Sequence, residues 1–381
     1  MKKIIIFYAS YGGGHLSAAK SIENYIEKYY PDINLQLIDC VKYVNKTIEK
    51  VSTAAYREMA KKAPWVWGRI YSDSQKGPLA HISSRANIIM AIKLLKLLKA
   101  EKPDLIISTH PFGSQMCSYL KRKGKISSKI ATIMTDFKSH DQWLVGSDFI
   151  DYFFVSNENM KNELINKDID SSKIYVTGIP VSERFLTTYN KKEILNSLNF
   201  SENKKTILFF AGGEFGLGKT KTLEIFESLV KNFNDIQIIA ISGKNEFMKK
   251  NFIKITDEYN KSSSVHILEY TDKVPEFMSI SDLVITKPGG LTTTEAITSG
   301  LPLLIINPIP GQEEENAEYL EENKIAIWIK KNDDINSVLN TMLNDENILT
   351  SMRKNIKLLA KPDSTKNICE ILLDPTFILK I

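Results

Sequence analysis

The sequence contains little cysteine and no long apolar run. Its three cysteines, Cys40, Cys117 and Cys369, lie far apart, with neither the short spacing of metal ligands nor an even number for pairing. We therefore expect a reduced, cytoplasmic protein. No segment approaches the roughly 18 consecutive apolar residues that a membrane span needs. The apolar start, residues 2–8, runs straight into a glycine loop without a cleavage site, so we interpret it as a buried strand rather than a signal peptide.

The composition is that of an ordinary globular protein. Hydrophobic residues make up 43% and charged residues 25% of the 381 residues, which excludes a mainly disordered, collagen-like or coiled-coil chain. Because a single core rarely grows beyond roughly 250–300 residues, this length favours two domains or one large one.

Positive charge is concentrated in one segment. The whole chain has a net charge of +5, whereas residues 42–102 alone contain 13 basic and 4 acidic residues. The segment also contains Trp65, Trp67 and an apolar run with regularly placed lysines at 88–99. Basic residues mixed with tryptophans and leucines suit an anionic membrane surface. The alternative is an ordinary amphipathic helix with its lysines in water. No nucleic-acid motif accompanies the charge, so we expect no nucleic-acid partner.

Short apolar runs alternate with helical patterns along the whole chain, which is typical of parallel sheets covered by helices. Each half opens with a strand, a glycine-rich loop and a helix, and these helices are expected to begin near Ser17 and Lys219. We therefore predict an α/β protein of two Rossmann-like domains, residues 1–185 and 186–381, with the apolar segment 368–381 packing back on the first. The expected strands are 3–9, 35–39, 105–109, 129–135, 152–156 and 174–177, then 206–211, 236–242, 265–268, 283–286, 303–307 and 326–329.

A glycine-rich loop follows the first strand of each half. Such a loop lets backbone N–H groups approach an anion at the N-terminus of the next helix, although a tight turn also needs glycine. Two such loops suit one phosphorylated ligand and one co-substrate. The glycines concerned are Gly12, Gly13 and Gly14 in the first half, and Gly212, Gly213 and Gly216 in the second.

The second loop also matches a nucleotide-binding pattern. Residues 213–220 fit G-x-x-x-x-G-K-[ST], after a strand and before a helix. A P-loop enzyme also needs a strand that ends in Asp to help hold Mg²⁺, and the candidate strands of this half end in Ser242, Thr286 and Asn307. A P-loop NTPase is therefore the less favoured interpretation.

The densest polar motif follows the expected strand 283–286. Gly289 and Gly290 give a ligand access to the backbone, and the next helix offers the positive potential of its N-terminus to a phosphate. Glu295, about one turn inside that helix, can accept both hydroxyls of a ribose or simply complement the helix dipole. Residues 308–316 form a proline-rich turn whose Gln, Glu and Asn side chains suit sugar hydroxyls or merely start an acidic helix.

Histidines and an aspartate follow strands of the first half. His15 ends the first glycine loop, His110 follows the third expected strand, and Asp136 and His140 follow the fourth. Residues just after the carboxyl ends of parallel strands line the crevice where ligands bind, and a His or Asp there can be a general base. Each histidine taken alone can equally be structural. No group of residues has the spacing of a metal site, so we expect neither a metal nor a cofactor.

Together these motifs resemble one enzyme family. The ordered set is similar to the monogalactosyl/glucosyl-diacylglycerol synthase family, in glycosyltransferase family 28 and related to MurG. Within it, the set most resembles the bacterial members that transfer glucose to diacylglycerol processively. The matching pieces cover nearly the whole chain and are Tyr11–His15, Thr135–Phe137 with His140 and Trp143, Gly178–Val181, Lys287–Ala296, Gly300–Pro302 and Pro310–Asn316.

The resemblance implies a GT-B fold, with two Rossmann-like domains facing a central cleft. It implies an inverting, metal-independent transfer of a hexose from a UDP-sugar to the hydroxyl of 1,2-diacylglycerol in an anionic membrane, at the inner face of the cell membrane. It also implies the contacts of each substrate. UDP would meet Gly212, Gly213, Gly216, Tyr270, Thr271, Lys287, Gly289, Gly290, Leu291, Thr292 and Glu295, the hexose would meet Gln312, Glu313 and Asn316, and the acceptor loop would include Gly12, Gly13, Gly14, His110 and His140.

Such a reaction needs a base, because the acceptor hydroxyl loses its proton as it attacks the anomeric carbon opposite UDP. His15 is our first choice, since its ordinary pKa lies near neutrality. Asp136 is the second, as the base itself or as the group that orients the histidine. The helix N-terminus at 289–292 would stabilise the leaving UDP, and a hinge near 180–192 would exclude water on closure. Glu214 departs from the family pattern by placing an anion beside the second glycine loop.

Other functions share the same donor motifs. A transferase acting on a polyprenol-linked sugar, a UDP-sugar epimerase and a UDP-sugar sensor without turnover all remain open. The sequence also leaves open glucose against galactose, processivity, acyl-chain preference and oligomeric state.

Overall fold

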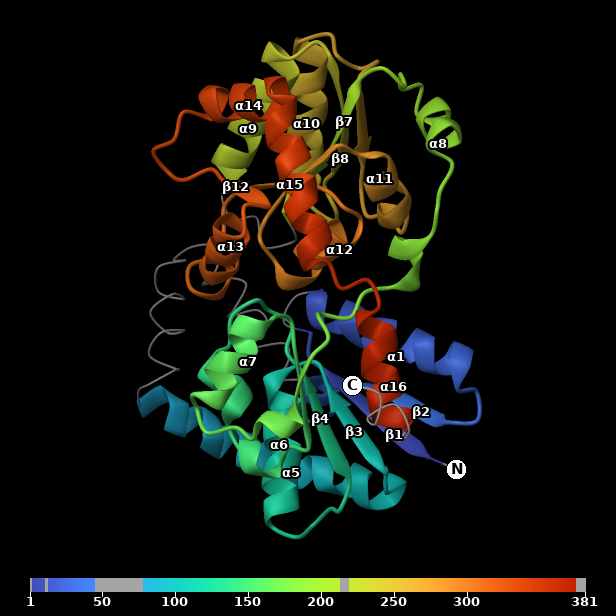
Figure 1. The fold of residues 1–381 in the computed structure, drawn as a ribbon, viewed down its shortest axis with the longest axis vertical. Coiled ribbons are helices and arrows are strands. Elements are labelled where there is room, and N and C mark those ends of the chain that lie inside the picture. The colour runs from blue at the N-terminus through green and yellow to red at the C-terminus, as the bar shows by residue number, and fades with distance from the viewer. Residues whose placement is uncertain (1, 11–12, 45–77, 213–218, 375–381) are drawn as a thin grey trace. The chain divides into compact units, whose positions relative to one another are not determined.

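The computed structural model describes residues 2–10, 13–44, 78–212 and 219–374, with the backbone alone at 78–89 and 219. The chain divides into two compact units (Figure 1). The first unit is Met1–Ser182 together with Lys361–Ile381, and the second is Glu183–Ala360. Each unit is built around one parallel sheet of six strands.

The sheet of the first unit has the strand order β2-β1-β3-β4-β5-β6, and every neighbouring pair is parallel. The central strands are almost wholly buried because helices cover both faces, which is why they read as continuous apolar runs rather than alternating ones. The strands are β1 (Lys3–Tyr8), β2 (Asn34–Asp39), β3 (Leu105–Ser108), β4 (Lys129–Ile133), β5 (Tyr152–Val155) and β6 (Ile174–Val176).

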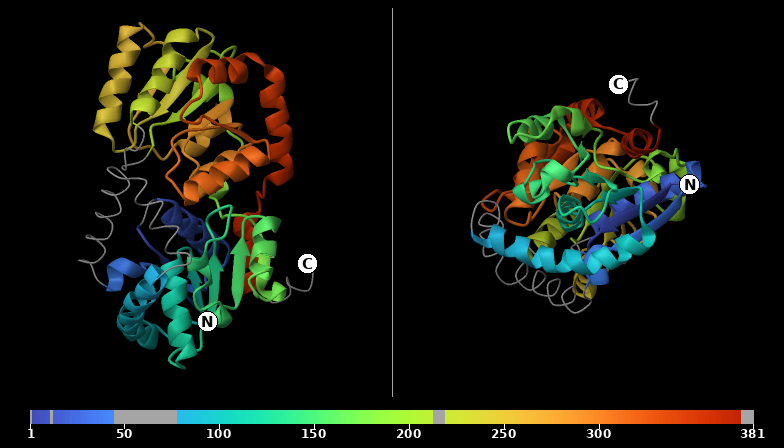
Figure 2. Two further views of the ribbon diagram at one scale, coloured as in Figure 1. Left: turned by 90° about the vertical axis from the view of Figure 1, so that its left-hand side faces the viewer. Right: turned by 90° about the horizontal axis from the view of Figure 1, so that it is seen from below.

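Alternate residues of these strands enter two separate cores, one on each face of the sheet. Ile4 and Ile6 of β1 pack under α1 (Gly14–Tyr29) and α16 (Ser364–Leu373), so the last helix belongs to the first unit (Figure 2). Ile5 and Phe7 face the opposite layer. That layer contains α2 (Cys40–Val44), α5 (Pro78–Glu101), α6 (Pro111–Arg122) and α7 (Glu158–Ile165), and the short 3-10 helices are η1 (Asp141–Leu144), η2 (Ser147–Phe149) and η3 (Ser171–Lys173).

The sheet of the second unit has the order β12-β11-β10-β7-β8-β9 and is also parallel throughout. Its strands are β7 (Lys205–Phe210), β8 (Ile236–Ile241), β9 (Val265–Leu268), β10 (Leu283–Thr286), β11 (Leu303–Ile305) and β12 (Ala326–Trp328). Its helices are η4 (Glu183–Leu186), α8 (Lys191–Ser197), α9 (Lys219–Asn232), α10 (Glu246–Glu258), α11 (Val274–Ile280), α12 (Gly290–Thr298), α13 (Gln312–Glu322), α14 (Ile335–Asn344) and α15 (Glu346–Leu359).

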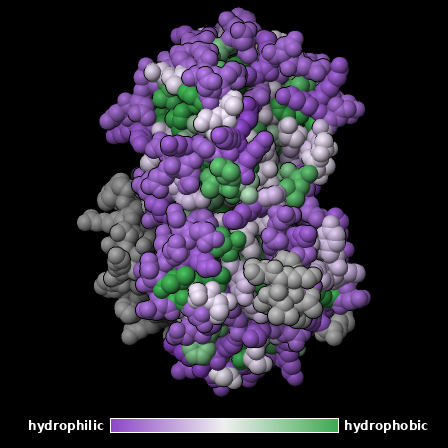
Figure 3. Space-filling model, in the orientation of Figure 1, coloured by the Kyte–Doolittle hydropathy of each residue, from purple (hydrophilic) through white to green (hydrophobic). Residues whose placement is uncertain are grey.

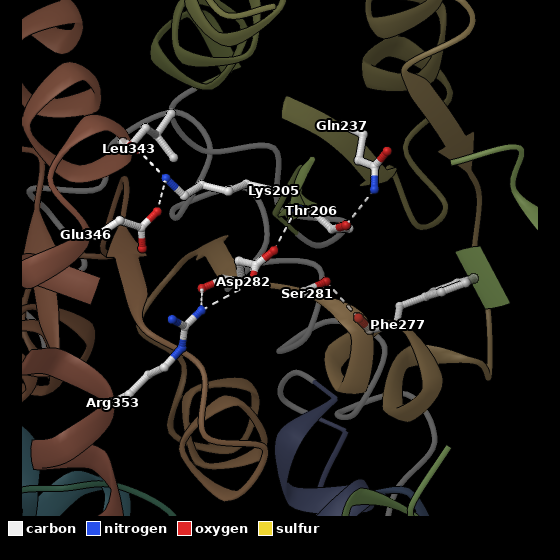
Figure 4. A network of polar contacts seen from close by, with 9 residues as sticks. All are labelled: Lys205, Thr206, Gln237, Phe277, Ser281, Asp282, Leu343, Glu346 and Arg353. Atoms are coloured by element: carbon white, nitrogen blue, oxygen red, sulfur yellow. Dashed lines mark hydrogen bonds and ion pairs between the residues drawn. The ribbon is translucent and has the colours of Figure 1, made fainter. Parts of the chain in front are cut away.

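A polar network fastens α14 and α15 to the amino edge of the second sheet (Figure 4). Asp282 accepts the Thr206 N–H at 2.9 Å and the Arg353 guanidinium at 3.3 Å. Lys205 donates to the Leu343 carbonyl at 2.7 Å. This edge is therefore occupied by structural contacts, and the loops at the carboxyl edge are left to bind ligands.

All twelve expected strands are present, most of them one or two residues shorter than predicted. The predicted start of α1 near Ser17 is wrong. The helix begins at Gly14, and the Ser17 N–H already donates to the Gly13 carbonyl at 3.1 Å. His15 therefore lies in the first helical turn rather than at the end of a loop.

The face drawn in Figure 3 is mainly hydrophilic where it is described, and hydrophobic residues appear on it as small patches on each unit. Among the described helices, none combines the length and the apolar character that crossing a membrane requires.

Candidate functional site

The carboxyl edge of the first sheet gathers the histidines and the aspartate predicted from the sequence. His15 lies in the first turn of α1, His110 is the N-cap of α6 after β3, and Asp136 and His140 follow β4. The rings of His15 and His110 meet edge to face, with centroids 4.6 Å apart. His110, Asp136 and His140 are buried, while His15 keeps partial exposure to solvent.

The hydrogen bonds of His15 determine which ring nitrogen carries the proton. Its Nδ1 lies 2.7 Å from the carbonyl oxygen of Thr109 and 3.1 Å from Oγ1 of Thr135. A carbonyl oxygen can only accept, so Nδ1 carries the proton and donates it to Thr109. The lone pair of the neutral ring is then on Nε2. Thr109 also donates through Oγ1 to the His15 carbonyl at 2.8 Å, which ties α1 to β3 from both directions.

His110 has the opposite tautomer. Its Nδ1 accepts the N–H of Phe112 at 3.2 Å and so caps the first turn of α6. A nitrogen that accepts carries no proton, so the neutral ring holds its proton on Nε2. In this pair, Nε2 of His15 can accept a hydrogen bond and Nε2 of His110 can donate one.

Burial keeps these histidines uncharged near neutral pH. Desolvation lowers the pKa of His15, although the Asp136 carboxylate opposes this. Desolvation lowers the pKa of His110 well below its ordinary value and that of His140 to about 4. A neutral imidazole is the form that can act as a base.

The segment after β4 is held by its own hydrogen bonds. Ser156 donates to the Asp136 carbonyl at 2.8 Å, and Asn157 Nδ2 donates to the Phe137 carbonyl at 2.9 Å. Ser139 donates through Oγ to Glu163 at 2.6 Å. These contacts from β5 and α7 fix the positions of Asp136 and His140.

In the second unit, Lys287 connects the two predicted phosphate loops. Gly212 follows β7, Lys287 follows the adjacent strand β10, and Gly212 has φ +77°, which favours glycine. A Cβ on Gly212 would lie 3.1 Å from Cε of Lys287, so the lysine side chain crosses directly over this glycine. Desolvation lowers the pKa of Lys287, and the nearby Glu313 carboxylate opposes the shift.

Gly289 occupies open space at the N-cap of α12. Its φ of −67° suits any residue, and a Cβ added there would meet no atom of the described residues within 4 Å. The described part of the fold therefore does not itself require a glycine at this position. Gly290 and Leu291 follow in the first turn and are buried, and Thr292 is partly exposed.

Glu295 lies one turn further along α12. The side chain is partly exposed, but desolvation raises its pKa to about 8. The carboxyl group is therefore mostly protonated at neutral pH. A ligand that donates hydrogen bonds to it would favour the ionised form.

The first turn of α13 supports the neighbouring loops. Glu313 accepts the Ile309 N–H at 2.7 Å, and buried Asn316 donates to the Pro288 carbonyl at 3.1 Å. Asn316 thus anchors the loop that contains Lys287. Gln312, the first residue of α13, is partly exposed.

Two further predicted UDP contacts follow β9. Tyr270 is 76% exposed, and Thr271 accepts the Lys273 N–H through Oγ1 at 3.1 Å. An aromatic ring this exposed is available to a planar ligand.

Other predicted positions lie at the start of α1 or outside the described residues. Gly13 is the N-cap of α1, and a Cβ there would meet nothing within 4 Å, while Gly14 is the first helical residue. The described part of the chain holds no cluster of three or more His, Cys, Asp or Glu side chains suited to a metal. Outside the described residues lie Gly12, Gly213, Glu214, Gly216, most of the P-loop pattern and residues 45–77 of the basic segment.

Comparison with known proteins identifies the family. A family model described as monogalactosyldiacylglycerol (MGDG) synthase matches residues 15–181, and one described as glycosyl transferases group 1 matches residues 190–359. The chain is 32% identical over 378 residues to a processive diacylglycerol β-glucosyltransferase of Staphylococcus aureus strain MRSA252, covering 98% of this chain and 93% of that protein. The chain belongs to the monogalactosyl/glucosyl-diacylglycerol synthase family.

Solved structures share the fold of this family member at low sequence identity. Acinetobacter baumannii MurG superposes with a TM-score of 0.66 at 14% identity, over 100% of both chains. A UDP-GlcNAc 2-epimerase from Neisseria meningitidis, solved with UDP-GlcNAc, has a TM-score of 0.64 at 18% identity, over 98% of this chain and 100% of that one. The GT-B fold predicted from the sequence is thereby confirmed.

Proposed function

We propose that this protein transfers a hexose, glucose or galactose, from a UDP-sugar to the hydroxyl of 1,2-diacylglycerol, with inversion at the anomeric carbon. The relative that supports this acceptor matches both units rather than one domain. The observation that carries the chemistry is the tautomer of His15. Its Nδ1 donates to a fixed backbone carbonyl, so Nε2 is an available base near neutral pH.

The second unit binds the donor in this proposal. The diphosphate lies against Gly212, Lys287 and the N-terminus of α12, where the described residues leave room at Gly289. The sequence adds Gly213 and Gly216, which lie outside the described residues. Glu295 accepts the ribose hydroxyls, and the uracil lies against the backbone at Tyr270 and Thr271. Gln312 and Glu313 bind the hexose hydroxyls, while Asn316 supports them by holding the loop at Pro288.

The first unit binds the acceptor and removes its proton. The acceptor oxygen forms a bond to the anomeric carbon while the bond from that carbon to the β-phosphate oxygen breaks, and UDP leaves with the electron pair. Nε2 of His15 takes the hydroxyl proton and later releases it to solvent. Asp136 stabilises the imidazolium that forms, as its effect on the pKa of His15 indicates. No metal enters the proposed mechanism.

Access to diacylglycerol places the protein at the inner face of the cell membrane. The excess of basic residues in 42–102 is the sequence feature that supports contact with anionic lipid. In its described part, α5 has Lys93, Lys96 and Lys99 exposed, and Ile92 is exposed as well. The lysines suit the anionic headgroups of such a bilayer, and the exposed isoleucine suits its apolar interior.

The fold also favours a second candidate. Epimerases acting on UDP-sugars share this fold over nearly the whole chain, and they would use the same donor site without a lipid acceptor. A polyprenol-linked acceptor is the other alternative. The epimerase and the polyprenol-linked transferase both predict UDP binding. They differ from the proposal in the acceptor or the reaction, and therefore in the product.

A transfer assay separates these functions. Purified protein is mixed with anionic vesicles that contain diacylglycerol or a polyprenol-linked sugar, and with radiolabelled UDP-glucose or UDP-galactose in EDTA. A labelled glycolipid formed only with diacylglycerol supports the proposal and names the sugar. Intact UDP binding without glycolipid, or a labelled epimer of the donor, contradicts it.

A further inference from the structure

The hydroxyl of Thr135 lies against the same ring nitrogen of His15 as the Thr109 carbonyl does. Its Oγ1 is 3.1 Å from Nδ1 of His15, beside the 2.7 Å contact of Nδ1 with the Thr109 carbonyl oxygen. Thr135 is buried, and among the described residues the His15 ring is the one hydrogen-bond partner of its hydroxyl. The effect of this hydroxyl therefore falls on His15.

The backbone on both sides of Thr135 holds the hydroxyl in place. Thr135 follows β4. The N–H of Met134 donates to the Phe154 carbonyl at 2.9 Å, and the hydroxyl of Ser156 donates to the Asp136 carbonyl at 2.8 Å. Both neighbours of Thr135 are thus fastened to β5 or to the residue that follows it. The hydroxyl is therefore preorganised and need not be reoriented when charge develops on the histidine.

The tautomer of His15 makes the Thr135 hydroxyl an acceptor. Nδ1 carries the proton, because the Thr109 carbonyl can only accept. A protonated Nδ1 has no lone pair to offer a second donor, so the Thr135 oxygen accepts from the same N–H in a three-centre hydrogen bond. A positive charge on the ring strengthens both contacts, because hydrogen bonds from an ionised donor are stronger than neutral ones.

We propose that Thr135 is a positioning residue for the base: its hydroxyl oxygen orients the His15 ring and stabilises the imidazolium that forms when Nε2 takes the acceptor proton. This role rests on the proposed function, in which His15 is the base. Among the described residues, the charged and titratable groups that interact with His15 are Asp136 and His140 after β4 and His110 at the N-cap of α6. Burial disfavours the charged ring, whereas the Asp136 carboxylate favours it. Thr135 adds to the effect of Asp136.

The test follows the titration of His15 by NMR in the full chain with 15N-labelled histidine, and His15→Gln identifies its signals among the five histidines. Removing an acceptor disfavours the charged ring, so Thr135→Val should lower the pKa of His15 by about 0.5 or more. Thr135→Ala removes the same hydroxyl with a smaller side chain and should give the same result. Thr135→Ser keeps the hydroxyl, so the pKa should stay within about 0.2 of the parent value.

Thr132→Val is the matched control. Thr132 lies in β4 and is buried, and its hydroxyl is hydrogen-bonded to Oγ of Ser114 at 2.6 Å rather than to a histidine. The same substitution there should lower stability in urea unfolding and leave the pKa of His15 unchanged. In the transfer assay, Thr135→Val should lower kcat by about fivefold with the Kd of UDP unchanged. Its acid limb of kcat/KM should move to lower pH together with the NMR titration.

Three results would overturn the role of Thr135: an unchanged or raised pKa of His15 in Thr135→Val, an equal shift in Thr132→Val, or an equal shift in Thr135→Ser. A parent protein that forms no glycolipid while the NMR titrations behave as expected would refute the proposed function instead. His15 would then no longer be the base, although the effect of Thr135 on its ring would stand.

Discussion

Replacing His15 should remove the base while leaving the fold and the donor site in place. His15→Gln deletes the ring, and with it the 2.7 Å hydrogen bond to the Thr109 carbonyl. Such a bond contributes about 1 kcal/mol to stability, out of a total of about 5–15 kcal/mol. A general base contributes about 10²–10⁴-fold to the rate, equivalent to about 3–5.5 kcal/mol in the barrier. A loss of about 1 kcal/mol leaves nearly all of the protein folded, so unfolding cannot account for the expected loss of activity.

The assay measures initial rates of glycolipid formation beside the Kd of UDP and the free energy of unfolding. His266→Gln is the control, because His266 lies in β9 of the second unit, whereas the cluster belongs to the first unit. We expect His15→Gln to lose at least about 100-fold in kcat with UDP affinity unchanged. Retention of activity within about tenfold of the parent would refute His15 as the base and direct attention to Asp136.

The pH dependence of the parent protein tests the same reasoning. The base acts when deprotonated, and burial lowers the pKa of His15 from its ordinary 6.5. The acid limb of kcat/KM should therefore lie below pH 6.5. An acid limb at or above pH 6.5 would contradict the effect of burial on His15, on which the proposal depends.

Three further predictions concern donor binding and stability. Gly289→Ala should weaken UDP binding by about tenfold without changing the free energy of unfolding, because the added methyl meets no described residue and only the ligand. Gly13→Ala, at an equally open position in the first unit, should leave UDP binding unchanged. Equal effects of the two substitutions on UDP binding would contradict a diphosphate site at Gly289. Binding of UDP-glucose at pH 7 should release about one proton, because the ribose hydroxyls favour the ionised form of Glu295, whose pKa is about 8 in the free protein. Calorimetry in buffers of different ionisation enthalpy measures this release. The release should vanish at pH 9.5 and in Glu295→Gln, and its persistence in that variant would show that the proton comes from another group. His140 has a folded pKa of about 4 against an ordinary value of 6.5, so the unfolded chain takes up its proton first as pH falls and the folded state loses about 3 kcal/mol between pH 6.5 and 4; urea unfolding of His140→Gln should show a smaller loss over that window, and an identical loss would contradict the burial effect.

The strands could be predicted from the sequence because both faces of each sheet are covered. A doubly covered strand is a short continuous apolar run, and such runs mark β1, β3, β7 and β10 without ambiguity. Several predicted ends overshot by one residue where a small or polar residue, such as Thr109 or Ala211, directly follows the last residue of the strand.

The start of α1 was missed for a physical reason. Glycine has a low helix propensity, so a glycine run reads as a loop. The first turn of a helix leaves its N–H groups without intrahelical partners, and glycine there lets a ligand reach them. Gly14 and His15 are in that turn, and the helix therefore positions the proposed base.

The sequence predicted candidate site residues but not the contacts that set their chemistry. His15 was found from its place after β1, yet its tautomer depends on the carbonyl of Thr109, which lies 94 residues away. The pairing of β1 with β3 brings the two together. A backbone carbonyl has no signature in a side-chain pattern, and Nδ1 of His110 as the N-cap of α6 was likewise invisible before the fold was known.

The configuration of the product tests the central claim most directly. The full chain and His15→Gln are incubated in EDTA with UDP-glucose or UDP-galactose and vesicles containing diacylglycerol, and the lipid fraction is analysed by NMR at the anomeric proton. The account predicts a β-linked hexosyl-diacylglycerol from the parent protein, and at least about 100-fold less from the variant. An α-linked product, or a consumed donor with no hexosyl lipid, would contradict inverting transfer to diacylglycerol.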